Sequence, residues 1–284
     1  MINLYLNYKT KNLDSVPPSL NDIKKSKKIL FSIFTRYGDT IIDLMIIKEF
    51  IELYPKKYYL ILCPRQMQPY VEEFLPGLEF IAFNKRNFFE ITKVVKFIQR
   101  KKFDIGFNPW SNGLDSSFYI SFCDKFLFYK DFDKPNNINH YEVVRKYLKL
   151  FEKKWEIKKL KLKDNYQKIL ICPQSTDSRR NLSIQQLDIL VVDFQRMYNQ
   201  PEIVIASSDK SDFRKGCSSF EFKKSSKSSQ EFIELVKKNT LIVCADSGPL
   251  HIALALQKDL IALMRVTVPE IVINTGSCLR VDGF

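Results

Sequence analysis

The sequence predicts an α/β protein with two domains, each built around a parallel sheet. Apolar segments of strand length alternate with segments of helical periodicity along almost the whole chain, which is the pattern of parallel α/β units. The alternation is interrupted once, by a lysine-rich stretch at 152–163, and then begins again. At 284 residues the chain is also long for one compact core, since domains of ~100–150 residues are the common size.

The first half contains a complete set of alternating elements. Apolar runs predict strands at residues 29–34, 58–63, 79–83, 103–107 and 125–128. Apolar residues at helical spacing predict helices at 40–53, 68–74, 88–100, 114–122 and 140–151. Residues 1–28 are polar and basic after a short alternating start, and the pattern assigns them no role. We therefore expect a first domain over 1–151.

The second half restarts the same alternation after a linker at 152–165. Strands are predicted at 168–172, 202–206, 241–245 and 260–264, and helices at 183–198, 229–237 and 249–257. These elements predict a second domain over 166–284. Two parallel sheets of this kind predict two Rossmann-like domains that face each other across a cleft.

The charge of the chain predicts an acidic partner or an anionic surface. The formal net charge is +13, from 45 Lys and Arg against 32 Asp and Glu. The basic residues are spread over several segments, and no nucleic-acid-binding motif organises them. A phosphorylated or membrane-bound acceptor would use the same charge. Nonspecific binding of nucleic acid therefore stays a weaker alternative.

Cysteines and apolar segments indicate the compartment. The six cysteines form no Cys-x-x-Cys pair and lie mostly in apolar runs, as expected where thiols stay reduced. With only two histidines, a zinc site is not expected. No run approaches the ~20 apolar residues of a membrane span, and the first residues lack the basic-then-apolar layout of a signal peptide. We therefore expect a cytoplasmic protein.

The most informative motif joins strand 241–245 to helix 249–257, with the sequence Asp246-Ser-Gly-Pro-Leu-His251. A helix N-terminus presents unpaired N–H groups, and Gly248 lets a phosphate approach the backbone closely. Asp246 stands at the carboxyl end of a strand, where α/β proteins bind ligands. The alternative is that the polar residues only cap the helix and that His251 only packs.

A second polar loop follows strand 29–34 and contains Arg36, Gly38 and Asp39. Gly38 permits a tight turn before the helix. Asp39 is placed either to cap that helix or to project into the cleft.

A third polar loop follows strand 168–172 and contains Ser175, Thr176 and Arg180. Hydroxyl and guanidinium groups near a helix N-terminus suit a phosphate, although a solvated loop is the alternative. Three polar loops at equivalent strand ends of two α/β halves favour one shared anion site.

Other chemistries find little support. The chain has neither Gly-x-Gly-x-x-Gly nor Gly-x-x-x-x-Gly-Lys-Ser/Thr, so neither a dehydrogenase nor a P-loop nucleotidase is supported. Asp131-Phe-Asp133 has the Asp-x-Asp form that some transferases use to hold a divalent cation. It lies in a lysine-rich, proline-containing stretch, which favours a solvated loop.

Taken together, these motifs resemble glycosyltransferase family 9, the ADP-heptose:lipopolysaccharide heptosyltransferases. The resemblance rests on Arg36 to Asp39, His140, Ser175 with Thr176 and Arg180, and the Asp246-to-His251 motif, in order over about residues 29–265. It implies a GT-B fold with two Rossmann-like domains and a metal-independent, inverting transfer. The N-terminal domain would bind the acceptor and the C-terminal domain the nucleotide sugar.

The resemblance also implies a role for each matching residue. Asp39 matches the general base, and Asp246 the aspartate that contacts the donor sugar. Arg180 stands where the family has a phosphate-binding lysine. The phosphate-contacting hydroxyls and the diphosphate-binding turn are matched by Ser175, Thr176, Ser247, Gly248 and His251.

Two assignments are less direct. Asp209 stands where the family has an acidic residue that holds the ribose, and Asp212 competes for that place. Arg36 and Gly38 would lie on the acceptor side. The family's Lys-x-Trp-Pro is here Arg180-Asn-Leu-Ser183.

We therefore expect an inverting, metal-independent glycosyltransferase that moves a sugar, first of all heptose from ADP-heptose, onto a hydroxyl of a bacterial surface glycan such as the lipopolysaccharide or lipooligosaccharide core. A carboxylate can take the acceptor's proton, while Arg180 and backbone N–H groups stabilise the leaving diphosphate. No cofactor is expected beyond the nucleotide-sugar donor.

The expected partners are that donor and an anionic glycan or glycolipid acceptor, without specific nucleic acid. Peripheral contact with the inner face of the cytoplasmic membrane is left open. Two alternatives remain, a catalytically silent GT-B protein that binds a nucleotide sugar or glycan and a basic nucleic-acid-binding protein.

Overall fold

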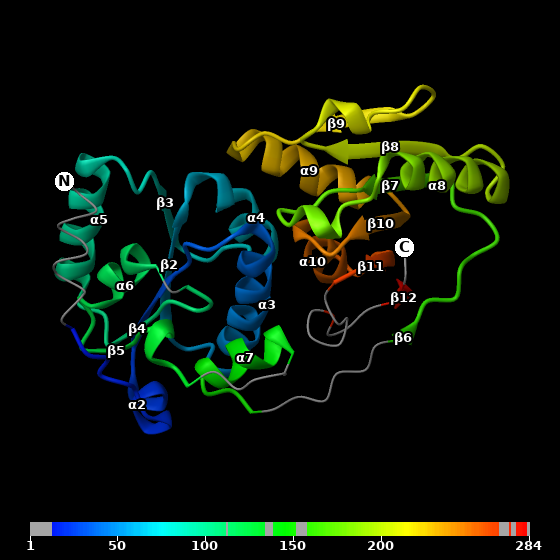
Figure 1. Ribbon diagram of the computed structural model, residues 1–284. Helices are drawn as coiled ribbons and strands as arrows, with labels where there is room; N and C mark the ends of the chain where they lie inside the picture. The colour runs from blue at the N-terminus through cyan, green and yellow to red at the C-terminus, as the bar shows by residue number, and fades with distance from the viewer. Residues whose placement is uncertain are drawn as a thin grey trace. The chain divides into compact units, whose positions relative to one another are not determined.

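The computed structural model describes residues 13–111, 113–133, 139–151, 158–266, 273 and 277–282. The chain divides into two compact units, coloured blue to green and green to red in Figure 1. The first comprises Met1–Asn136 and Tyr141–Lys153, and the second Asn137–His140 and Lys154–Phe284. Among the described residues, no helix has the length and apolar character needed to cross a bilayer.

The first unit contains a parallel sheet with the strand order β3-β2-β1-β4-β5. Its strands are β1 (Lys28–Ser32), β2 (Tyr58–Pro64), β3 (Phe80–Phe83), β4 (Ile105–Phe107) and β5 (Lys125–Leu127). Its helices are α2 (Leu20–Lys25), α3 (Tyr37–Leu53), α4 (Gln68–Phe74), α5 (Phe88–Lys101), α6 (Leu114–Ile120) and α7 (His140–Tyr147). The central strands read as continuous apolar runs because helices cover both faces of the sheet.

Neighbouring side chains of β1 show how the helices divide between these faces. Leu30 packs in one buried cluster with Ile91 of α5 and Tyr119 of α6. Phe31 points to the opposite face, where its ring centroid lies 5.7 Å from that of Phe50 in α3. The sheet is therefore a middle layer between two layers of helices.

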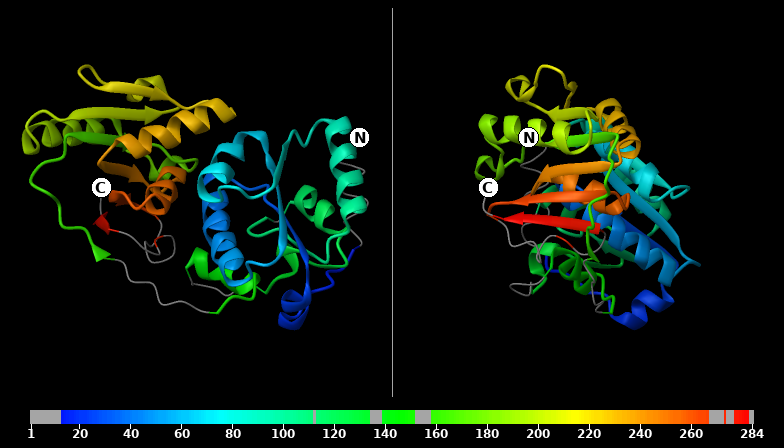
Figure 2. Two further views of the ribbon diagram at one scale, coloured as in Figure 1. Left: turned by 180° about the vertical axis from the view of Figure 1, so that it is seen from behind. Right: turned by 90° about the vertical axis from the view of Figure 1, so that its right-hand side faces the viewer.

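The second unit contains a parallel sheet with the order β6-β12-β11-β10-β7-β8-β9. Its strands are β6 (Lys158–Lys159), β7 (Lys168–Cys172), β8 (Glu202–Ser207), β9 (Ser218–Glu221), β10 (Leu241–Ala245), β11 (Asp259–Met264) and β12 (Ser277–Asp282). Its longer helices are α8 (Ile184–Met197), α9 (Ser226–Lys238) and α10 (Gly248–Ala255). The orange and red strands run side by side in the right-hand view of Figure 2.

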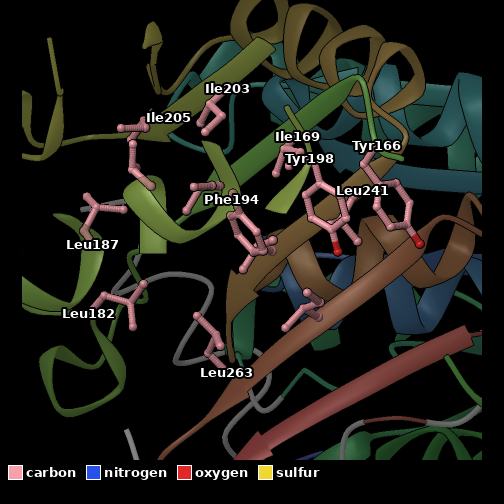
Figure 3. Close-up of a cluster of buried hydrophobic side chains, with 14 of the residues drawn as sticks. Tyr166, Ile169, Leu182, Leu187, Phe194, Tyr198, Ile203, Ile205, Leu241 and Leu263 are labelled. Carbon is pink, nitrogen blue, oxygen red and sulfur yellow. The ribbon is translucent and has the colours of Figure 1, made fainter. Parts of the chain in front are cut away.

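One buried cluster of the second unit lies between this sheet and α8. Phe194 and Leu187 of α8 pack in one buried cluster with Ile169 of β7 and Ile203 of β8 (Figure 3). Apolar residues at helical spacing in α8 thus meet apolar residues at alternate positions of the strands. This packing fixes where the loop between β7 and α8 begins and ends.

Both sheets contain a topological switch point. In the first unit β1 lies between β2 and β4, and in the second unit β7 lies between β8 and β10. Successive connections leave such a point towards opposite sides of the sheet, and open α/β sheets bind their ligands beyond the carboxyl ends of the strands at this point. The polar loops after β1, β7 and β10 begin at these ends.

The predicted α/β class with two Rossmann-like domains is confirmed, and each predicted strand is found within one or two residues of its predicted ends or, for β4, as a shorter strand. Among the strands and α-helices of the described residues, four were not predicted, namely β6, β9, β12 and α2. β9 carries one large apolar residue, and its side chains are mostly exposed at the edge of the sheet. β6 lies inside the stretch interpreted as a linker. Short edge strands of this kind give no apolar run to detect.

Candidate active site

The switch point of the second unit is occupied by an ion pair between Arg180 and Asp246. Asp246 directly follows β10 and is buried, with 3% of the residue exposed. Nη1 of Arg180 lies 2.9 Å from Oδ2 of Asp246. A buried carboxylate is costly without a counter-charge, so Arg180 makes the burial of Asp246 tolerable. The sequence places these residues 66 positions apart, and the fold joins them.

Arg180 also retains a hydrogen-bond donor for a ligand. It ends a short 3-10 helix, Ser178–Arg180, in which the N-cap residue Asp177 accepts a hydrogen bond from the backbone N–H of Arg179. The Nε–H group of Arg180 is buried, donates no hydrogen bond to any described residue and lies 3.7 Å from Oδ2 of Asp177. The guanidinium thus lies between two carboxylates, and because 31% of the side chain is exposed it can contact an anion as well.

The loop between β7 and α8 is held from both sides. The backbone N–H of Ser175 donates to the side-chain oxygen of Asn181 at 2.7 Å, and Leu182 N–H donates to Pro173 C=O. The hydroxyls of Ser175 and Thr176 make no hydrogen bond to the described residues. These two hydroxyls are thus positioned by the backbone and available to a ligand.

Helix α10 begins next to Asp246 with its N-terminal donors uncapped. Ser247 is the N-cap residue, but its side chain makes no cap hydrogen bond and donates instead to the carbonyl of Ala245. Pro249 occupies the first turn, where a missing N–H costs nothing. The alternative that Asp246 or Ser247 only caps the helix through its side chain is therefore wrong, because no side-chain cap hydrogen bond is made. The start of α10, including Gly248, can bind an anion through the backbone.

His251 lies in α10 and is buried, with 6% of the residue exposed. Burial is the main cause that lowers the pKa of His251 to about 3, and His140 lowers it further. His251 is therefore a neutral side chain at physiological pH and not a cation that binds phosphate by charge.

His140 belongs to the second unit by its contacts, although it is the first residue of α7. Burial lowers the pKa of His140, Asp246 raises it, and Arg180 lowers it. The side chain thus lies within electrostatic reach of the Arg180–Asp246 pair. The sequence reasoning gave His140 no role, because its distance along the chain hides this proximity.

The loop after β8 contains Asp209 and Asp212 in different situations. Asp209 is exposed, and its carboxylate accepts from Ser211 N–H at 2.9 Å. Asp212 is buried and accepts from the Ser207 hydroxyl at 2.6 Å, so it supports the loop. Of the two, only Asp209 is exposed.

Gln174 links this loop to the loop after β7. Its side-chain oxygen accepts from the Ser208 hydroxyl at 2.8 Å. The sequence reasoning did not single out Gln174. Its position, as a polar residue two places beyond the end of a predicted strand, is the signal that could have indicated it.

In the first unit, Asp39 lies in the first turn of α3, close after β1. The N-cap residue is Arg36, and no side-chain cap hydrogen bond is made, so Asp39 is not the cap of this helix. Gly38 also lies inside the first turn, which corrects the expected tight turn before the helix. Burial raises the pKa of Asp39 to about 6, and Arg36 partly opposes this. A carboxyl with such a pKa is suited to exchange protons near neutral pH.

Asp43 lies one turn further along α3 and was missed by the sequence reasoning. It is fully buried, and neither carboxylate oxygen accepts a hydrogen bond from a described residue. Burial raises the pKa of Asp43 well above its usual value, and the Asp39 charge adds to this. Its place in an apolar stretch of helix gave no signal of a buried acid.

The Asp131-Phe-Asp133 stretch is not assembled into a cation site. Asp131 accepts from the Ser15 hydroxyl at 2.6 Å and lies 3.9 Å from Lys130 Nζ. Within the part of the chain that the structure describes, no group of three or more His, Cys, Asp or Glu side chains could hold a metal ion.

Comparisons with known proteins agree with this fold. Residues 228–275, which include the Asp246-to-His251 motif, match glycosyltransferase family 9 (heptosyltransferase). No curated protein sequence matches the chain.

Three solved structures share the fold over most of the chain. A glycosyl transferase family 9 protein from Veillonella parvula is 13% identical with a TM-score of 0.68, covering 90% of this chain and 86% of its own. E. coli heptosyltransferase WaaC with ADP is 10% identical at a TM-score of 0.63, covering 89% and 93%. E. coli ADP-heptose lps heptosyltransferase II is 16% identical at 0.63, covering 89% and 90%. The predicted resemblance to family 9 is confirmed over residues 228–275 by the family match, and over most of the chain by the shared fold of these structures.

Proposed function

We propose that the protein is an inverting, metal-independent glycosyltransferase that transfers heptose from ADP-heptose to a hydroxyl of a bacterial surface glycan, such as the lipopolysaccharide core. The observation that carries the proposal is the Arg180–Asp246 pair beside the uncapped start of α10. In the proposal the second unit holds the donor and the first unit supplies the base.

The donor diphosphate is assigned to the groups around α10. Its oxygens would accept from Arg180, from the hydroxyls of Ser175 and Thr176, and from N–H groups at Ser247 and Gly248. Negative charge grows on the diphosphate as the glycosidic bond breaks, and donors already in place stabilise it without rearrangement. These groups can do so without a metal ion. The exposed carboxylate of Asp209 is assigned to the ribose.

Asp246 is assigned to the sugar itself. Its carboxylate is held by Arg180 on one side, which leaves acceptor capacity for a donor hydroxyl. His251 is neutral, so it would accept or donate one hydrogen bond and contribute no charge.

Asp39 is assigned as general base. As the acceptor oxygen attacks the anomeric carbon from the side opposite the diphosphate, Asp39 takes its proton, and the anomeric configuration inverts. Arg36 and Gly38, in the same turn, are assigned to the acceptor side. The net charge of +13 suits an anionic acceptor, and we place the protein in the cytoplasm, where nucleotide sugars and reduced thiols are found.

Nucleotide binding tests this proposal directly. Melting temperatures are measured for the whole protein with ADP, UDP and GDP, because a ligand that binds only the folded state raises the melting temperature. We expect ADP to give the largest rise, and Arg180→Ala to remove most of it. The control is Arg179→Ala, since Arg179 is 73% exposed and pairs only with Asp177 among the described residues. An equal ADP-induced rise in both variants would contradict the assignment of Arg180.

A further inference from the structure

Helix α5 of the first unit carries two adjacent aromatic side chains that the core does not use. Phe88 is 59% exposed and Phe89 is 77% exposed. Their ring centroids lie 6.2 Å apart, so they form one apolar projection at the start of the helix. Large aromatic side chains are rarely left in water without a function when they stand together.

The orientation of α5 is fixed by its opposite face. Ile91, Val94 and Ile98 are buried in the cluster against the sheet, beside α6 (Figure 1). The Asn87 side chain caps the helix by accepting from Phe89 N–H at 3.0 Å. The two phenylalanines are thus held outward by a well-defined helix start.

The exposed face behind them is basic. Residues 85–102 contain seven Lys and Arg and one acidic residue, Glu90, a net charge of +6. Lys93, Lys96 and Arg100 are exposed at positions four, seven and eleven after Phe89, which places all four on one helix face. Glu90 does not interrupt this face, because it is turned to Arg65 and to the backbone of Asn84.

We infer that the Phe88–Phe89 pair and the basic face of α5 dock on an anionic phospholipid surface. Aromatic side chains favour the boundary between head groups and acyl chains, and Lys and Arg are attracted by anionic head groups. An amphipathic helix with aromatic residues at one end and cations along its polar face combines both interactions. A purely electrostatic partner such as nucleic acid would explain the cations and leave the exposed rings without a role.

Helix α8 provides an internal contrast. It also exposes apolar side chains, among them Ile189 at 62% and Met197 at 58%. Its exposed residues include Asp188, paired with Arg214, together with Asp193 and Arg196, so α8 does not carry the row of cations that an anionic surface would attract. Both helices expose apolar side chains. Of the two, α5 also carries the positive charge that suits an anionic lipid surface.

The inference goes beyond the proposed transfer reaction and does not depend on it. Arg180 and Asp246 belong to the other unit, and binding to lipid requires no nucleotide sugar. Vesicle binding and ADP binding are therefore measured separately. Either proposal can be contradicted by its own measurement while the other is supported.

The experiment is co-sedimentation of the whole protein with vesicles of phosphatidylcholine alone or mixed with phosphatidylglycerol. We expect binding to the mixed vesicles, weakened by added sodium chloride. Phe88→Ser with Phe89→Ser should reduce the partition coefficient about ten-fold. Lys93→Gln with Lys96→Gln should reduce it by about five-fold per residue.

Each variant has a matched control. Ile189→Ser removes an equally exposed apolar side chain from α8, and Lys223→Gln with Lys224→Gln removes the same charge from exposed positions of the second unit. Both should bind vesicles like the wild type, and unchanged melting temperatures show that all variants are folded. The inference is overturned if the wild type does not bind mixed vesicles, if it binds nucleic acid and not vesicles, or if the controls lose as much binding as the α5 variants.

Discussion

Arg180 and Asp246 form a 2.9 Å ion pair that joins the loops after β7 and β10 at the switch point of the second sheet. The carboxylate is almost fully buried, whereas the guanidinium is 31% exposed. The pair therefore has two functions that can be separated, since it neutralises a buried charge and presents a cation to a ligand.

Loss of this cation should destabilise the protein even without a ligand. Arg180→Ala leaves the Asp246 carboxylate buried and unpaired, and we expect the free energy of unfolding to fall by about 1–2 kcal/mol, less than for a fully buried pair because water reaches Arg180. Arg180→Lys should restore part of this. Urea denaturation measures the effect, and Arg179→Ala, at an exposed position, should cost less than about 0.5 kcal/mol. Equal losses in the two alanine variants would show that the ion pair is not structural.

Asp43 should make stability depend on pH. Its folded-state pKa is raised, so the folded protein holds a proton that the unfolded chain releases near pH ~4. Stability is then fully present below that pH and is lost as the pH rises towards the folded-state pKa. Asp39 contributes in the same direction up to about pH 6.

The matching variant is Asp43→Asn, which cannot ionise. We expect the melting temperature of the wild type to fall between pH 5 and pH 8 and that of the variant to fall less over the ~3 pH units. Identical pH dependence in both proteins would show that Asp43 does not titrate in this way.

Transfer should follow the ionisation of Asp39. A general base must be deprotonated, so the rate should rise with pH through about 6 and level off above it. Because the Arg36 charge lowers the pKa of Asp39, Arg36→Gln should move the inflection to higher pH. Initial rates at saturating donor over this pH range measure both curves. A rate that is constant between pH 5 and pH 7 would remove Asp39 from this role.

The sequence reasoning predicted the buried strands because the fold leaves local signals there. Strand β10 is apolar throughout and β7 is apolar after Lys168, and Asp246-Ser-Gly stands out because polar residues directly follow β10. Sequence patterns could not reveal residues that only the fold brings together, such as His140 and Asp246. The sequence reasoning also missed Asp43, because one acid within an apolar helix resembles an ordinary polar position. Short edge strands such as β9 carry too few apolar residues to be recognised.

Transfer should also survive an excess of chelator. The proposed stabilisers of the leaving diphosphate are Arg180, two hydroxyls and backbone N–H groups, none of which needs a cation. Activity is measured before and after incubation with EDTA and again after adding magnesium or manganese. Loss in EDTA with recovery on either metal would contradict the assignment and return Asp131 and Asp133 to consideration.

The central claim is that the protein transfers a sugar with Asp39 as base and the donor held by the other unit. The most direct measurement compares heptose transfer from ADP-heptose by the wild type and by Asp39→Asn, with ADP binding measured on the same samples. Glu52→Gln, at an exposed position of the same helix, is the control. We expect Asp39→Asn to lower the turnover number by roughly 10²–10⁴-fold while the protein stays folded and ADP binding changes little, and Glu52→Gln to behave as the wild type. Turnover within a few-fold of the wild type in folded, ADP-binding Asp39→Asn protein would contradict the account.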